Sequence, residues 1–117
     1  MTNYSFNFSS QPRSKFNPDT WMTGNEKAFW DFHEVHPEFA VAFDKYTWEL
    51  IHAGRERGSA YLICERIRWD TVLSGADVDG FKINNNHRPY YARLWMQQNP
   101  GHEGFFQTRE IRNRLAA

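Results

Sequence analysis

The sequence predicts a mainly helical α+β domain, in which three to four helices and a small two-stranded β-ribbon surround an aromatic-rich core. Three observations lead to this prediction. Apolar residues recur at helical spacing in several stretches that are bounded by capping and stop residues. Two short apolar stretches, residues 81–83 and 105–111, could pair as a ribbon. Ten Phe, five Trp and five Tyr supply large side chains to the core of a chain of only 117 residues.

The clearest helical pattern covers residues 37–53. Pro37 suits the first position of a helix, and Gly54 suits the position just after its end. The apolar side chains between them recur at spacings of four, three and four residues: Phe39, Phe43, Tyr46 and Leu50. A shorter helix is expected at residues 26–33, with Asn25 as its N-cap.

Two further helices are expected at residues 60–73 and 89–98. Ser59 is the predicted N-cap of the first, and Pro89 suits the first position of the second. The apolar side of helix 60–73 is predicted to consist of Leu62, Ile63, Ile67 and either Trp69 or Val72. Its charged residues then lie mainly on the other side: Glu65, Arg66, Arg68 and Asp70. The buried stripe of helix 89–98 is predicted to be Tyr91, Leu94 and Trp95.

These two helices, with residues 81–83 and 105–111 as a wing, suggest an irregular winged-helix-like arrangement. Helix 60–73 would be the supporting helix and helix 89–98 the recognition helix. The connection from Ser74 to Asn86 is longer than the usual turn of three or four residues. The arrangement would therefore depart from the usual form of the motif.

The chain is expected to contain one globular domain, at residues 25–111. Residues 1–24 are rich in Ser, Asn and Thr and contain Pro12 and Pro18, which predicts an irregular arm. This arm also carries five aromatic residues, so we expect it to pack onto the domain or onto a partner. Residues 112–117 are expected to fray.

Charge is balanced over the whole chain but not along it. Fourteen basic and fourteen acidic residues cancel, so no net field attracts the protein to nucleic acid or to a membrane surface. From residue 81 onward there are six basic and two acidic residues, and five of the six are arginine. The planar guanidinium fork suits phosphate groups and base edges. The C-terminal third is therefore the predicted DNA-binding region.

The densest candidate site is the run FKINNNHRPYYARLWM at residues 81–96. Its polar residues surround the predicted start of helix 89–98, where free backbone N–H groups attract phosphate. Asn and Arg read base edges, and Tyr can stack on an unpaired base. The predicted DNA-binding residues are Lys82, Asn84, Asn85, Asn86, His87, Arg88, Tyr90, Arg93, Arg109, Arg112 and Arg114. The same pattern fits a structural role, in which the asparagines form a turn and cap while the arginines face solvent.

Protein binding is the alternative function. Trp combines a large apolar body with a polar group, which suits it to the centres of interfaces. The candidate anchors are Trp21, Trp30, Trp48 and Trp69. The partner could be a host protein complex, inhibited in the manner of an anti-CRISPR protein, or a second copy of the chain acting as an adaptor. A homodimer would let a small aromatic-rich domain complete its core.

Signals for catalysis are weak, and we predict a non-enzymatic protein with no catalytic residue, no cofactor and no metal site. Asp77 and Asp79 could hold Mg²⁺ in a small nuclease, but no third carboxylate follows at a recognisable spacing. His33 and His36 are separated by a predicted helix break, so they make a poor zinc pair. Cys64 is the only cysteine, which excludes an intrachain disulfide, and its place beside an apolar stripe predicts an inert core residue.

The sequence favours a cytoplasmic protein. No apolar run approaches the roughly 20 residues that a membrane-spanning helix needs. The N-terminus, MTNYSFNFSSQPRSK, lacks the basic start and apolar core of a secretory signal.

Four stretches carry a family resemblance: HPEF at 36–39, ERIRWDT at 65–71, NNNHRPYYARLWM at 84–96 and GFF at 104–106. Over about residues 36–111, the chain resembles uncharacterised small proteins encoded by phages and prophages. The resemblance supplies no catalytic residues. It implies action by binding, either to DNA or to host defence proteins, in the cytoplasm of a bacterial host cell.

Overall fold

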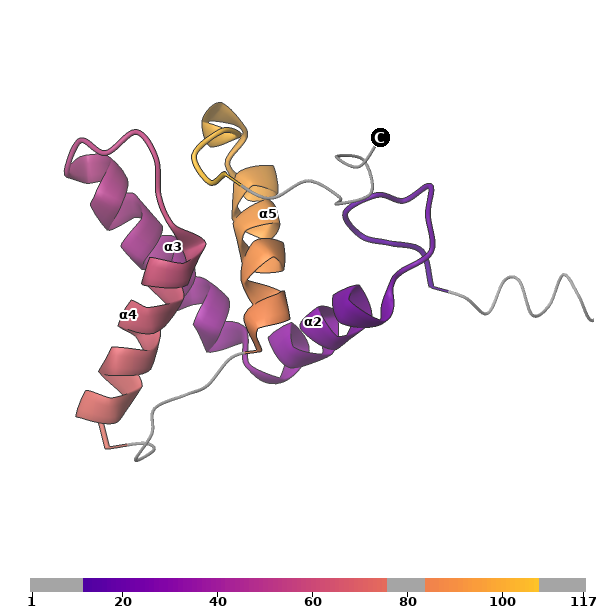
Figure 1. Cartoon of the computed structure of the whole chain (residues 1–117), viewed down its shortest axis with the longest axis horizontal. Helices are drawn as coiled ribbons and strands as arrows, with labels where there is room; N and C mark the ends of the chain where they lie inside the picture. Colours follow the sequence, from indigo (N-terminus) through magenta and orange to yellow (C-terminus); the bar gives the residue numbers. More distant parts are fainter. Residues whose placement is uncertain (1–11, 76–83, 108–117) are drawn as a thin grey trace, which may run out of the picture.

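Helices dominate the computed structural model, which describes residues 12–75 and 84–107 (Figure 1). Four α-helices and two short 3₁₀ helices follow one another in these ranges: α2 (Gly24–Val35), α3 (Pro37–His52), α4 (Ala60–Leu73), η1 (Asn85–His87), α5 (Arg88–Gln98) and η2 (Pro100–His102). The prediction of a mainly helical fold is confirmed. Each of the four α-helices begins and ends within two residues of its predicted bounds.

α2 begins earlier than predicted because its N-cap is Thr23, not Asn25. The Thr23 hydroxyl accepts a hydrogen bond from the backbone N–H of Glu26 at 3.1 Å. Thr23 and Glu26 have the spacing of a capping box, a sequence signal that the prediction of Asn25 overlooked. The Glu26 carboxylate turns away from the box and accepts hydrogen bonds from Ser14 Oγ and the backbone N–H of Lys15.

These hydrogen bonds fix the arm at residues 12–23 to the start of α2. The buried Ser14 hydroxyl lies 2.7 and 2.8 Å from the two carboxylate oxygens of Glu26. Phe16 extends the contact, because its ring stacks on Trp30 and Tyr90 at centroid distances of 5.3 and 5.5 Å. This part of the arm therefore packs onto its own chain, one of the two expectations from the sequence.

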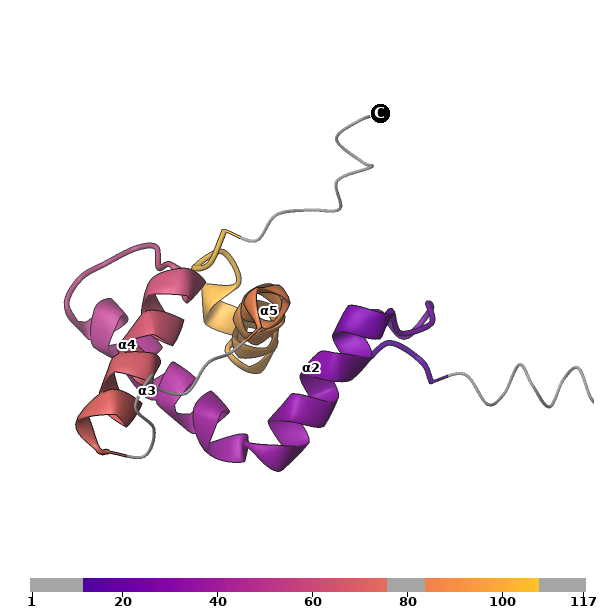
Figure 2. The same cartoon turned by 60° about the horizontal axis from the view of Figure 1, so that its bottom comes forward.

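α5 lies between two groups of elements. α3 and α4 lie side by side, and α5 packs against both (Figure 1). On the other side of α5, α2 contacts α3 and η1 and then runs outward to the arm (Figure 2). α4 is left at the edge of the molecule, with α3 and α5 on its inner side.

The core is built largely from rings, as the composition predicts. Tyr91 is almost fully buried at its centre, and its ring centroid lies 4.7 Å from that of Phe29 and 4.9 Å from that of Phe39. A second cluster surrounds Trp95, which meets the rings of Trp48, Phe105 and Phe106 at 5.6–5.8 Å. Rings at these distances gain edge-to-face and stacking energy in addition to burial.

The predicted β-ribbon is not supported. Within residues 12–75 and 84–107 there is no β-strand, and residues 81–83 and 108–111 lie outside the described ranges. Phe106 forms a single parallel bridge with Gly58, and the Gly58 N–H donates a hydrogen bond to the Phe105 carbonyl at 3.0 Å. Both phenylalanines are buried, whereas an alternating strand would direct only one of two neighbours inward. The wing of the winged-helix-like arrangement is therefore missing from the described part of the chain.

Candidate protein-binding surface

α4 has a well-defined start and a tightly packed inner face. Ser59 caps it as predicted, since its hydroxyl accepts a hydrogen bond from the Leu62 N–H at 3.2 Å. Ile63, Cys64 and Ile67 are at most 5% exposed and belong to the core. They lie one and three residues apart, which places them on one side of the helix.

Polar contacts fix the rotation of α4 about its axis. The Tyr46 hydroxyl of α3 donates a hydrogen bond to the Asp70 carboxylate, which raises the pKa of Tyr46 because the bond holds its proton. Arg66 lies over the Tyr46 ring at 4.4 Å and pairs with Asp70 at 3.6 Å. α4 therefore presents a defined outer face.

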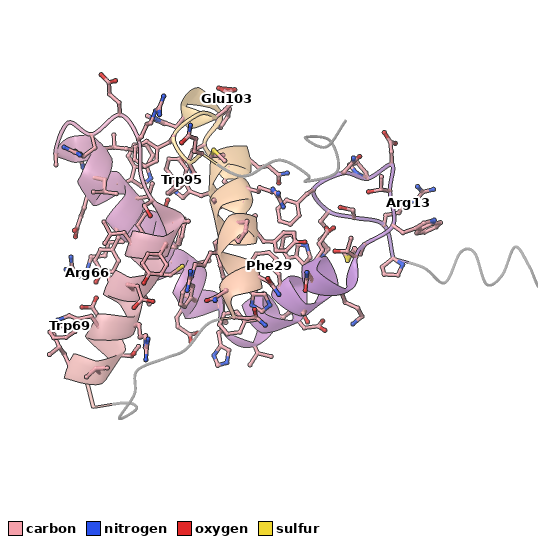
Figure 3. All side chains as sticks on the ribbon, viewed as in Figure 1. Arg13, Phe29, Arg66, Trp69, Trp95 and Glu103 are labelled. Carbon is pink, nitrogen blue, oxygen red and sulfur yellow. The ribbon has the colours of Figure 1, made fainter. Side chains whose placement is uncertain are left out.

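The outer face of α4 also carries large apolar side chains. Tyr61, Leu62, Trp69 and Leu73 are 55–67% exposed, and Val72 is also exposed. Figure 3 places Trp69 at the edge of the molecule, on the side of α4 away from α5. A helix with apolar residues on both faces is expected to be covered on both faces, and exposed apolar patches of this kind mark interaction sites.

This arrangement corrects the predicted orientation of the helix. Ile63 and Ile67 are buried as expected, but Leu62, Trp69 and Val72 face outward. The reason is that Cys64, together with the two isoleucines, fills the inner face, which leaves the other apolar residues on the opposite side. The sequence did carry a signal for this, because one helical stripe cannot include all its large apolar residues.

Two rows of side chains run along the outer face, each at spacings of four, three and four residues. The first row is Tyr61, Glu65, Arg68 and Val72, and the second is Leu62, Arg66, Trp69 and Leu73. Glu65 and Arg68 form an ion pair at 3.8 Å. A shallow hollow of about 270 Å³ is lined by Glu65, Arg68, Trp69 and Val72.

The two described arginines of the predicted DNA site lie in different grooves. Arg88 lines a groove of about 700 Å³ beside the start of α4, where its guanidinium lies 4.4 Å from the Tyr61 ring centroid. Arg93 lines a groove of about 800 Å³ beside the arm, 5.3 Å from the Tyr90 ring centroid. Five residues of helix separate them by well over a quarter turn. The remaining basic residues lie outside the described ranges: Lys82, Arg109, Arg112 and Arg114.

The other predicted DNA-binding residues have structural roles in the fold. Asn84 caps η1 by accepting a hydrogen bond from the Asn86 N–H, and Asn85 accepts one from the Arg88 guanidinium. His87 is buried, and its pKa is lowered by desolvation. The half-buried Tyr90 ring stacks on Phe16 and Phe29 at 5.5 Å and lines the same groove as Arg93.

Of the four predicted protein anchors, all of which lie in the described ranges, Trp69 alone is exposed. Trp21 is half-buried beneath the Arg13 guanidinium. Trp30 packs on Phe16 and Phe29. Trp48 donates a hydrogen bond to Asp44 at 3.0 Å and packs on Trp95. Tyr61, Leu62, Val72 and Leu73 surround Trp69 on α4 and were not predicted as binding residues.

The structure bears on two kinds of candidate catalytic group, metal ligands and the Cys64 thiol. Residues 12–75 and 84–107 hold no cluster of three metal-ligating side chains, and Asp77 and Asp79 lie outside these ranges. Burial raises the pKa of the Cys64 thiol to about 12, which leaves it a poor nucleophile.

None of the described helices has the length and apolar content that a bilayer crossing requires. Comparison of the chain with protein-family models, with curated proteins and with solved structures found no match.

Proposed function

We propose that this chain is a non-enzymatic binding protein whose partner is an amphipathic helix of a protein, received along the outer face of α4. One observation carries the proposal: α4 is held in place by its inner face while five large apolar side chains remain exposed on the opposite face. Covering them removes apolar area from water, the main driving force of protein association.

The chemistry of the outer face matches a helical partner. Its two rows follow the spacing of one helix, so a second helix packed along it can insert side chains between them. Trp69 supplies the kind of anchor on which interface energy concentrates. Glu65 and Arg68 lie in the middle of the face and offer both signs of charge, which favours a partner that presents the opposite signs in the matching order.

DNA binding stays a prediction, and the described residues favour it less. Arg88 contacts Tyr61 and Asn85, and Arg93 lines a separate groove. A fluorescence-anisotropy titration with labelled duplex at low salt tests this function directly. Binding that weakens steeply with salt, and that is unchanged in Trp69→Asp, would replace protein binding by DNA binding.

The test of protein binding uses a matched pair of variants. Trp69→Asp places a charge at the centre of the outer face, whereas Val41→Asp places one at an apolar residue of α3 that is 70% exposed. Tagged wild-type protein and both variants are incubated with bacterial lysate, and a photo-reactive phenylalanine analogue at position 69 cross-links whatever touches the face. Circular dichroism checks that the variants fold.

We expect the wild-type protein and Val41→Asp to retain the same partner, and Trp69→Asp to lose it. Retention of the partner by Trp69→Asp, or cross-linking at position 69 to no protein at all, would contradict the proposal. A cross-link to a second copy of the chain counts as protein binding in this assay, because the assay does not depend on which protein supplies the helix.

A further inference from the structure

The first row of the outer face is complementary to itself when it is reversed. Tyr61, Glu65, Arg68 and Val72 read as apolar, acidic, basic and apolar along the chain. In the opposite direction the order is apolar, basic, acidic and apolar. Two copies of α4 that run antiparallel therefore place Glu65 of each copy opposite Arg68 of the other.

The second row fits the same alignment less closely. Leu62 and Leu73 of the two copies lie two residues, about 3 Å, from the same level along the helix axis. The register also brings the two Arg66 residues close together, and each guanidinium is paired with Asp70 of its own chain at 3.6 Å. Trp69 lies beside the middle of the face in both copies. The hollow between Glu65, Arg68, Trp69 and Val72 lies where the second copy brings Tyr61, because Tyr61 and Val72 are opposite each other in this register.

We infer that the helix received by the outer face of α4 is α4 of a second copy, packed antiparallel about a two-fold axis that passes between Glu65 and Arg68. This inference rests on the proposed function and names its partner. A parallel pair would instead place each residue beside its own equivalent, which sets Glu65 against Glu65 and Arg68 against Arg68. Like charges at such positions oppose association.

Arg88 has a place in this interface. Its guanidinium lies over one face of the Tyr61 ring at 4.4 Å. The second copy can therefore cover the other face of the ring without displacing Arg88. The contact holds Tyr61 at the end of α4, where the antiparallel register needs it. A residue that the sequence suggested for DNA thus orients an aromatic side chain of the interface.

The first experiment measures mass against concentration for the full chain, by sedimentation equilibrium from about 1 to 200 µM. A single helix pair is a small interface, so we expect a micromolar dissociation constant and a mass that rises from 13.9 kDa toward twice that value. Trp69→Glu should weaken the dimer at least about thirtyfold. Val41→Glu, the control on α3, should leave it unchanged.

The second experiment tests the register by exchanging charges. Glu65→Arg gives each copy two positive charges in the first row, and Arg68→Glu gives each copy two negative ones. Each single variant should dimerise about tenfold more weakly than the wild-type protein. The double variant restores opposite signs at facing positions and should dimerise like the wild-type protein. An equimolar mixture of the single variants should form a heterodimer tighter than either homodimer.

A mass of 13.9 kDa at every concentration overturns the inference. So does a dimer that survives Trp69→Glu, because it uses another surface, and so does a double variant as weak as the single ones. None of these results by itself contradicts the proposed function, which fails if position 69 contacts no protein or if Trp69→Asp retains the partner. Cross-linking at position 69 to a different protein alone would retain the function and reject the second copy.

Discussion

The two faces of α4 are made of similar residues but differ in what covers them. Ile63, Cys64 and Ile67 on the inner face are packed against the core, whereas Leu62 and Trp69 on the outer face remain exposed. The inner face supplies the stability of the folded chain, and the outer face holds apolar area that folding alone does not bury. Apolar residues in a sequence therefore indicate which faces of a helix are suited to burial. They do not indicate whether the same chain or another molecule buries each face.

Thiol labelling gives the largest expected contrast between the faces. Because burial raises the pKa of Cys64 to about 12 from 9.0, its thiolate fraction near pH 8 is about a thousandfold below that of an ordinary thiol. Leu62→Cys adds an exposed thiol to the same helix. With a chromogenic disulfide reagent at low protein concentration, we expect one fast and one very slow phase in this variant, and only the slow phase in the wild-type protein.

A fast phase in the folded wild-type protein would show that the inner face opens readily. Labelling of both proteins in concentrated urea provides the control, since there both thiols should react at the ordinary rate. At high protein concentration the fast phase of Leu62→Cys should slow if the outer face is covered by a second copy.

Truncation of apolar side chains should separate the faces next most strongly. Ile67→Ala leaves a cavity on the inner face and should lower the free energy of unfolding by about 2–5 kcal/mol. Leu62→Ala, on the outer face, should change it by less than about 0.5 kcal/mol in the monomer. Urea denaturation at low protein concentration measures both, and equal losses would contradict the assignment of the two faces.

A smaller effect on stability is expected at Gly58, just before α4, where the backbone packs closely against Phe105. A methyl group at Gly58 would overlap the Phe105 ring, and Phe105 is buried, so Gly58→Ala should lower the free energy of unfolding by about 1–3 kcal/mol. Gly24 at the start of α2 has open space around it. Gly24→Ala should be neutral or stabilising by up to about 1 kcal/mol. A neutral Gly58→Ala would mean that residues 105–106 can move away from α4.

Local signals predicted the helices well because each is marked by nearby residues. Ser59 before α4 and Pro37 at the start of α3 determine where a helix begins through contacts within one turn. The direction of Phe105 and Phe106 depends instead on Trp95 and Gly58, which lie far away in the sequence, and the predicted ribbon failed there. The sequence alone did not show which distant residues these two side chains would contact.

The candidate site was harder to predict for the same reason. Trp69 was named as an anchor from its chemistry alone, together with three tryptophans that the fold uses in packing. Arg88 and Arg93 looked equivalent in the sequence, but neighbouring rings hold them in separate grooves. The packing of α3 and α5 against α4 decides which of its side chains are buried and which stay exposed. This packing depends on contacts between residues that are distant in the sequence.

Acidification should produce the smallest effect on stability, and it tests the burial of His33 in α2 and His87 in η1. The Nδ1 atoms of His33 and His87 are buried with no hydrogen-bond partner among the described residues, and desolvation lowers the pKa of both side chains below 6.5. Well above pH 6.5 both histidines are neutral, whether the chain is folded or unfolded. As the pH falls below 6.5, the unfolded chain takes up protons that the folded chain resists, so stability falls.

We expect the midpoint of thermal unfolding to drop by a few degrees between pH 7.5 and pH 5.5 on account of these two histidines. The double variant His33→Gln, His87→Gln should lose less stability over this interval than the wild-type protein does. The comparison uses the change with pH within each protein, so any packing lost with the two rings cancels. An equal change in both proteins would mean that the two imidazoles take up protons as readily in the folded chain as in the unfolded chain.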